Sequence, residues 1–228
     1  MRRRLLFIVL ALALGAGPAC AADVVGVQFR EWSFSDGNDM HDAIVYANVR
    51  WLHLQLERWD FERGQDQVRP EVGVVFKDHR RSAYTAQWRG ERLADRYWIG
   101  TEQVVGEHWV LRGEVSPIVR RDASTLTVWD VGADVYWASY SLAGVTVIRD
   151  PRGDDLWVVP VRARFASESN DWVQVTVAPA SRRTVGWALD GKWHWIRAGV
   201  ERNSRFDFTN VDNTIWTLGL EWPIHRPQ

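Results

Sequence analysis

The residues of this chain whose types could do chemistry are arginines and carboxylates that alternate with apolar residues. In the run from Trp157 to Phe165, for example, Arg162 and Arg164 fall between apolar neighbours. Alternate side chains of a strand share one face of a sheet, so these charges predict one continuous polar surface. That surface would comprise Arg30, Arg50, Arg89, Glu102, Arg112, Glu114, Asp130, Asp134, Arg162, Arg164, Arg197, Glu201 and Glu221.

Both signs of charge are present in similar number on this surface, which leaves two interpretations open. In the first, acids and arginines pair with one another and fill the interior of the fold, because an isolated buried charge is very costly. In the second, they line a narrow pore or a ligand site. The candidate pore lining is the C-terminal part of the surface: Arg112, Glu114, Asp130, Asp134, Arg162, Arg164, Arg197, Glu201 and Glu221.

Catalysis is the other chemistry that polar residues could perform. His79 and Ser82 are close enough in sequence to act as base and nucleophile, but they flank two arginines in a predicted turn. They match no motif of barrel phospholipases or lipid A deacylases. The segment 36–42 holds three aspartates and a histidine, whose spacing is ordinary for a turn and fits no metal-binding loop. We therefore predict no catalytic residue, no metal site, no cofactor and no enzymatic activity.

The elements that must position the charges are β-strands. The last run, Trp216 to Trp222, alternates apolar and polar residues with a period of two, and most segments before it do the same. No helical periodicity follows the first 22 residues, so no helix is available to cover either face. A closed barrel satisfies both faces, with lipid outside and polar side chains inside. We predict an all-β, up-and-down antiparallel transmembrane barrel of about twelve strands.

The strand count depends on how two regions and the weakest runs are interpreted. Residues 45–56 are interpreted as one strand. The parity of its apolar positions switches around His53, which indicates a bulge there or a strand that runs past the membrane edge. A long connection through Arg182 and Arg183 is expected between the runs that end at Val177 and begin at Ile196. The count falls to ten if the weakest runs are loops.

Tryptophan is unusually abundant, with 15 residues in the chain. Many stand near the beginning or end of an alternating run. Tryptophan prefers the boundary between membrane and water, where its ring is apolar and its N–H can be hydrated. Ordinary packing or carbohydrate stacking is the alternative. We predict an aromatic girdle that includes Trp129, Trp137, Trp157, Trp216 and Trp222.

The first 22 residues have the pattern of a signal peptide. Arg2 to Arg4 form a basic start and Leu5 to Leu14 an apolar segment that is too short to span a membrane. We predict cleavage after Ala21 or Ala22, which makes residues 1–22 the signal peptide and residues 23–228 the outer-membrane barrel domain.

Cys20 is the only cysteine of the chain. A lipidated N-terminus at Cys20 is an alternative to simple cleavage, but Gly17 stands where lipoprotein signals prefer leucine. Either way, the segment 23–228 contains no cysteine, which excludes disulfides and thiolate metal sites from it.

The formal net charge is −1, and removing the arginines of the predicted signal makes it more negative. This charge predicts no nucleic-acid partner. The partners we expect are outer-membrane lipid and lipopolysaccharide, the barrel assembly machinery, and a small solute or polysaccharide component.

Three blocks of sequence resemble a known family. They are Val147–Gly153, which leads into the strand Trp157–Phe165, the block Arg96–Gly100, and the closing Leu218–Trp222. With these blocks the chain resembles the YaiO family of outer-membrane β-barrel proteins. The resemblance implies an outer-membrane location and an up-and-down barrel, and it supplies no catalytic residues. Bacterial barrels usually end on an aromatic residue that the assembly machinery reads, whereas this chain continues beyond Trp222.

The sequence therefore predicts a barrel that is not an enzyme and that acts as a narrow channel or as a structural barrel associated with envelope or exopolysaccharide components. One alternative is a barrel enzyme that modifies lipid or lipopolysaccharide. The other is a soluble periplasmic β-sandwich whose tryptophans bind glycans.

Overall fold

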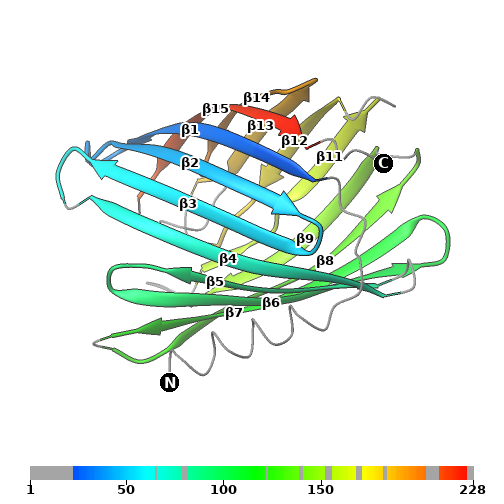
Figure 1. Ribbon diagram of the computed structural model, residues 1–228, viewed down its shortest axis with the longest axis horizontal. Coiled ribbons are helices and arrows are strands. Elements are labelled where there is room, and N and C mark those ends of the chain that lie inside the picture. Colours follow the sequence, from blue (N-terminus) through cyan, green and yellow to red (C-terminus); the bar gives the residue numbers. More distant parts are fainter. Residues whose placement is uncertain are drawn as a thin grey trace.

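The computed structural model describes residues 23–64, 66–78, 82–121, 123–138, 141–151, 156–167, 171–181, 184–203 and 211–224. Its elements are β-strands (Figure 1). They are β1 Val24–Phe34, β2 Met40–Val49, β3 Leu52–Phe61, β4 Gln67–Asp78, β5 Ser82–Gly90, β6 Ala94–Val105, β7 Trp109–Arg120, β8 Leu126–Tyr136, β9 Leu142–Asp150, β10 Leu156–Val158, β11 Val161–Ala166, β12 Trp172–Ala178, β13 Gly186–Trp193, β14 Ile196–Arg202 and β15 Asn213–Pro223. The predicted signal peptide lies outside the described residues.

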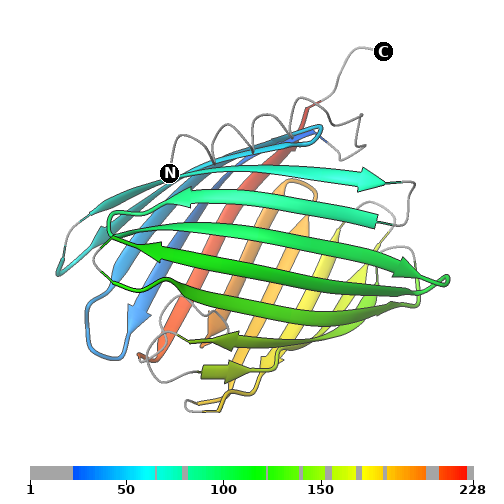
Figure 2. The same ribbon diagram turned by 90° about the horizontal axis from the view of Figure 1, so that it is seen from below.

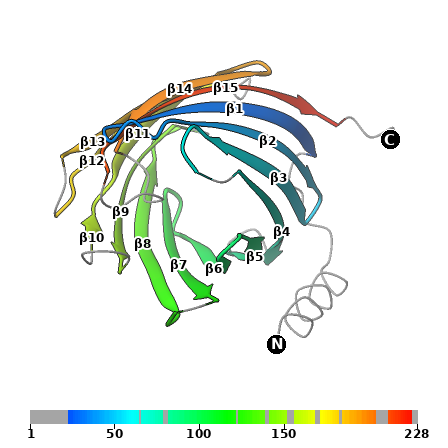
Figure 3. The ribbon, with the colours of Figure 1, turned by 90° about the vertical axis from the view of Figure 1, so that its left-hand side faces the viewer.

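The strands form one antiparallel sheet that closes on itself (Figure 3). β1 pairs with β15 along its whole length, from Val24 opposite Pro223 to Phe34 opposite Asn213. The ring is continuous on the other side as well, because β8 pairs with β9. Strands of the near wall run across those of the far wall in Figure 2, as expected for the strand tilt that closure requires. The predicted closed antiparallel barrel is confirmed.

The barrel wall has 14 strands, because β10 and β11 are two parts of one strand. Both pair with β9 in a single register, in which Val158 faces Ile148 and Arg162 faces Gly144. Pro160 lies in the gap between them and has no N–H to donate to the ladder. Its carbonyl still accepts a hydrogen bond from the N–H of Thr146 at 2.9 Å.

The prediction of about twelve strands, or ten, is wrong because two strands escaped it. Arg50 and Trp51 form a tight hairpin turn between β2 and β3, with Arg50 at a φ of 56°. The sequence-based interpretation joined these two strands into one with a bulge. The predicted connection through Arg182 and Arg183, which lie outside the described residues, contains β13, where Trp187 faces Arg202 across the β13–β14 ladder.

The pairing places alternate side chains inside and outside the barrel. On β1, Gln28 and Arg30 are buried in the interior while Phe29 is exposed on the outer surface. Large apolar residues dominate the outer surface, and Val131 and Leu218, in the middle of their strands, are 53% and 58% exposed. A sheet folded in water would bury this face, so the barrel is inverted relative to a soluble fold.

The two ends of the barrel differ. We call the end that holds the first and last described residues the terminal end, where the N–H of Ile224 donates to the carbonyl of Asp23 at 2.7 Å. It has short connections such as 50–51 and 194–195. The opposite end, called the far end, has the longest connections, 179–185 and 203–212.

Apolar side chains line the interior at the far end. Trp32, Met40, Trp59 and Ile215 form one buried cluster from β1, β2, β3 and β15. Two further clusters continue the layer around the wall: Ala94, Ile118 and Val128, then Leu156, Val158 and Ala178. The charged interior therefore begins below an apolar layer and extends toward the terminal end.

Candidate functional site: the charged lumen

The register of the sheet turns the nine predicted pore-lining residues toward the interior. It also turns Arg30, Arg89 and Glu102 inward. Arg50 was expected on this surface, but it occupies the exposed turn between β2 and β3, where its N–H donates to Asp23 Oδ1. That prediction is wrong because the hairpin turn removes Arg50 from any strand face.

Asp134 is the centre of the C-terminal half of the lumen. Its side chain is 2% exposed and is shared by two arginines from different strands. Arg162 donates from Nη2 to Oδ2 at 2.6 Å and from Nε to Oδ1 at 3.3 Å. Arg112 Nε lies 3.1 Å from Oδ2, and its Nη2 also donates to Thr146 Oγ1 at 3.1 Å. One carboxylate thus serves two guanidinium groups, and positive charge is in excess.

A cavity of about 410 Å³ opens beside this group. Arg112, Arg162 and Arg164 line it together with the acids Glu102 and Asp134, and the remaining lining residues are Ser82, Ala83, Val104, Val110, Tyr136 and Leu142. These residues come from the terminal half of β5 to β11. The cavity can admit a small polar solute and favours a negative one, since three cations face two anions of which one is already shared.

Gly144 has no side chain, and this leaves room for the carboxylate of Asp134. A Cβ built on Gly144 would lie 1.8 Å from Asp134 Oδ1 and 3.1 Å from the carbonyl oxygen of Ala133. We predict that Gly144→Ala displaces the carboxylate and lowers the free energy of unfolding by about 1–3 kcal/mol. Gly113→Ala is the matched control, because no atom lies closer than 4.0 Å to a Cβ there. Urea titration of both variants in lipid vesicles checks this, and equal midpoints would contradict it.

Glu114 and Asp130 face each other across β7 and β8, which brings two like charges together. Arg96 reaches the same region from β6, where its Nε donates to Ser116 Oγ at 2.8 Å. Arg112 is two residues from Glu114 on the same inward face of β7. The four charges form a mixed layer in the middle of the lumen.

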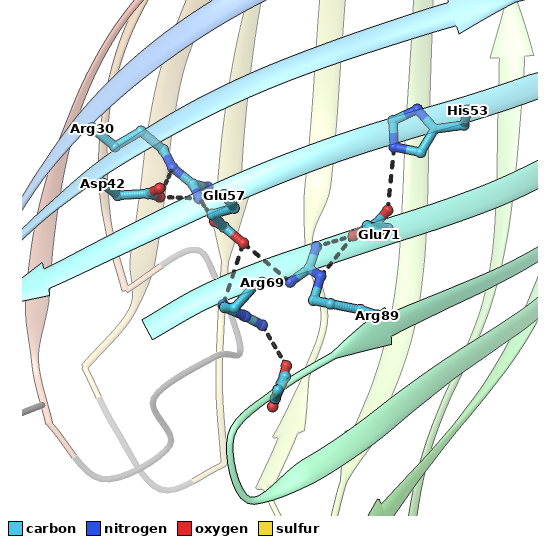
Figure 4. Close-up of polar contacts among 8 residues, drawn as sticks. Arg30, Asp42, His53, Glu57, Arg69, Glu71 and Arg89 are labelled. Atoms are coloured by element: carbon cyan, nitrogen blue, oxygen red, sulfur yellow. Dashed lines mark hydrogen bonds and ion pairs between the residues drawn. The ribbon is translucent and has the colours of Figure 1, made fainter. Parts of the chain in front are cut away.

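A second ionic cluster lines the inner face of the wall from β1 to β5 (Figure 4). Glu57 is its centre, with a side chain that is 1% exposed. Arg30 donates to Glu57 and, from Nε at 2.6 Å, to Asp42 Oδ2. Arg69 Nη1 and Arg89 Nη1 approach Glu57 Oε2 at 3.4 Å and 3.7 Å.

The cluster continues toward the terminal end through Glu71. Arg89 Nε donates to Glu71 Oε2 at 2.6 Å, and His53 Nε2 lies 3.3 Å from Oε1 of the same carboxylate (Figure 4). On its other side Arg69 pairs with Glu91 and stacks over Trp59, with its Cζ 3.8 Å from the ring centroid. Ion pairs thus join this part of the wall into one network.

Most members of this cluster were missed by the sequence analysis. Asp42 was assigned to an acidic turn, and Glu57 lay in a segment that was merged with the preceding strand. The signal was present: a two-residue hairpin pairs positions of opposite parity, so apolar residues must switch parity across it. The register confirms this, with Val49 opposite Leu52. A tight turn at Arg50–Trp51 would have placed Glu57 inside.

The remaining predicted residues lie on β14 and β15. Glu221 accepts hydrogen bonds from Tyr46, at 2.7 Å, and from Lys192. Glu201 is buried in the wall near the far end. Arg197 faces the lumen, and its Cζ lies 5.8 Å from the ring centroid of Trp172.

The predicted girdle residues are on the outer surface. Trp129 packs edge-on against Trp157, and Trp195 lies near Trp222, with ring centroids 5.4 Å and 6.4 Å apart. From their strand positions, the outward tryptophans form a group near the far end, Trp129, Trp157, Trp187 and Trp216, and a group near the terminal end, Trp109, Trp137, Trp193, Trp195 and Trp222. Their role at a membrane boundary remains a prediction. Others, Trp32, Trp59, Trp98 and Trp172, face the lumen.

Of His79 and Ser82, the two residues considered for catalysis, His79 lies outside the described residues. The Ser82 hydroxyl donates to Gln103 Oε1 at 2.7 Å. No group of three or more histidine and acidic side chains suited to a metal ion is found among the described residues. A search of the same residues for a helix long and apolar enough to cross a membrane also finds none.

Comparison with known proteins shows a likeness in structure only. The KdgM porin superposes with a TM-score of 0.55 at 10% sequence identity, over 88% of this chain and 100% of KdgM. The chain has a porin-like fold. The toluene transporter TodX of Pseudomonas putida gives 0.53 at 6% identity over 92% of both chains. A triple mutant of the Rhodopseudomonas blastica porin gives 0.52 at 6% identity, over 88% of this chain and 99% of the porin.

Sequence comparison adds no relative. No family model matches the chain, and no curated protein matches it. Membership of the YaiO family therefore stays a prediction. At such low identities the structural likeness establishes the closed antiparallel barrel and leaves the function to the geometry of the lumen.

Proposed function

We propose that this protein is a narrow channel in the bacterial outer membrane. The observation that carries the proposal is the inverted barrel: an apolar outer face encloses a lumen lined by charged side chains and containing a cavity of about 410 Å³. The two groups of outward tryptophans support a membrane that lies between them. The proposal has two further parts. Residues 1–22 would be a signal peptide that is cleaved on export, and the chain would be a member of the YaiO family.

The proposed orientation follows from the connections between strands. Outer-membrane barrels have short turns on the periplasmic side and longer loops outside the cell. The terminal end, with turns such as 50–51, would face the periplasm, and the far end, with the connections 179–185 and 203–212, would face the exterior. Lipid and lipopolysaccharide would then surround the wall, and the barrel assembly machinery would insert it.

The solved structures support a role in solute passage. KdgM is described as a porin and has been solved in complex with disordered oligogalacturonate. TodX is described as a toluene transporter. The charged lumen of this chain favours a hydrophilic solute, because burying an apolar solute among ion pairs gains little. Nothing in the geometry of the described residues favours an enzyme that modifies lipid.

Single-channel recording tests the proposal. We predict that the refolded protein, inserted into a planar bilayer, gives small discrete conductance steps whose size rises with salt concentration. The steps should be small because charged side chains line the wall and an apolar layer narrows the lumen at the far end. A silent bilayer with verified insertion would overturn the channel and leave a plugged barrel with a structural role in the envelope.

A variant of the apolar layer makes the test specific. Trp59→Ala removes a large ring from the interior and should raise the conductance. Trp187→Ala is the matched control, because it removes the same side chain from the outer surface, where it is 43% exposed. If both variants conduct alike, ions do not pass the apolar layer.

A further inference from the structure

The terminal half of the lumen contains two arginines that form no direct ion pair with an acid among the described residues. Among the described residues, Arg164 and Arg197 have no carboxylate oxygen within ion-pair distance. Arg164 Nε instead donates to the amide oxygen of Gln174 at 3.0 Å. Arg197 Nε is buried and has no hydrogen-bond partner in the part of the chain that the structure describes.

Trp172 joins these two arginines. The Cζ of Arg164 lies 4.5 Å from its ring centroid and that of Arg197 lies 5.8 Å from it. Cation–π contact partly compensates the two positive charges and holds both guanidinium groups at one aromatic ring. Lys192, which lies between Trp172 and Arg197 in the register, is a further cation and is paired with Glu221.

Neighbouring arginines add positive charge to this part of the lumen. Arg162 is two residues from Arg164 on the same face of β11, and it shares the single carboxylate of Asp134 with Arg112. Three guanidinium groups at the cavity therefore face two acids, Asp134 and Glu102. Beside it, Arg197 and Lys192 both interact with one acid, Glu221. In a lumen of low dielectric constant such an excess attracts an anion from solution, because uncompensated charge is costly there.

We propose that Arg164, Arg197 and Trp172 form a binding site for a carboxylate-bearing solute in the terminal half of the lumen. Each guanidinium offers a planar fork of N–H donors that matches a carboxylate in bidentate geometry. Arg162, whose Nε and Nη2 donate to Asp134, adds positive charge at the adjoining cavity wall. The chemistry fits a small organic acid or an acidic saccharide. The site deepens the proposed channel function and rests on it for its place on a permeation route.

Isothermal titration calorimetry on the detergent-solubilised barrel tests the site with three probes: citrate, an oligomer of galacturonate, and maltotriose as the uncharged saccharide. We expect binding of a carboxylate probe that weakens as salt rises. Binding of citrate would assign the site to small organic acids, and binding of the galacturonate oligomer alone would assign it to acidic saccharides. Equal binding of maltotriose would overturn the proposal.

Variants connect the binding to these residues. Arg164→Gln combined with Arg197→Gln should lower the affinity for the carboxylate probe by about tenfold or more. Arg149→Gln is the matched control, because Arg149 also lies over a tryptophan, 5.8 Å from the ring of Trp157, but on the outer surface. An unchanged affinity in the folded double variant would overturn the site. If that variant does not fold, Arg164→Lys keeps the charge without the fork and should still weaken binding.

Calorimetry needs no ion flow, so the site and the channel can fail separately. Binding by a protein that is silent in the bilayer would keep the site and reject the channel. Conductance without binding of any carboxylate probe would keep the channel and reject the site.

Discussion

Arginine placed in the middle of the outer face is expected to prevent stable insertion of the barrel. Val131 and Leu218 are central in β8 and β15 and point outward. At the bilayer midplane an arginine on the lipid side of a barrel costs about 2–4 kcal/mol. Val131→Arg and Leu218→Arg should therefore each reduce the folded fraction in lipid vesicles, as measured by urea titration.

The control for this experiment is an arginine outside the membrane. Glu107 lies in the turn between β6 and β7, and its side chain is 92% exposed. Glu107→Arg changes the charge of the chain by more than either test variant, but it should leave insertion unchanged. Equal tolerance of all three substitutions would show that the apolar face does not contact lipid and would reject the proposed location.

The sequence predicts faces better than it predicts strands. A period of two assigned Phe29, Val131 and Leu218 to the outer face and their charged neighbours to the inner face, because each side chain must alternate with the next along any strand. The predicted number of strands was too low because alternation along the chain does not show where one strand ends and the next begins. The turn at Arg50–Trp51 contains neither glycine nor proline, so only the switch in the parity of the apolar positions marks it.

β13 was missed for a different reason. Its outward face reads Trp187, Leu189, Gly191 and Trp193, so a glycine interrupts the apolar pattern. Its inward face carries Gly186, Ala188, Asp190 and Lys192, so small and charged residues are mixed on it. β13 can be recognised as a strand only from its pairing with β12 and β14, which lie along its two edges.

In the candidate site, too, features set within one strand could be predicted from the sequence, whereas features that depend on several strands could not. The inward direction of Arg112, Asp134 and Arg162 was predictable from alternation within each strand. Their convergence on one carboxylate was not, because it depends on the registers of β7, β8, β9 and β11 together. That Arg164 and Arg197 form no direct ion pair among the described residues is likewise a property of the assembled lumen.

Glu57 is expected to be the most important single carboxylate for the stability of the barrel. It is almost completely buried, and Arg30, Arg69 and Arg89 approach it from three strands. Glu57→Gln preserves the volume of the side chain but leaves three buried guanidinium groups with one fewer negative charge. Removing one partner of a buried ion pair typically costs about 3–5 kcal/mol, because the remaining charge is left without compensation. Urea titration in lipid vesicles should show a loss of this size.

Asp60, on the same strand, provides the matched comparison. It forms an ion pair with Arg58 at 2.8 Å on the outer surface, where both side chains are exposed. Water and salt screen such a pair, so Asp60→Asn should leave the urea midpoint unchanged. If Glu57→Gln were as harmless as Asp60→Asn, the ionic cluster of β1 to β5 would not stabilise the barrel. Its arginines would then be available to solutes, and the whole lumen, rather than its terminal half alone, would be a binding surface for anions.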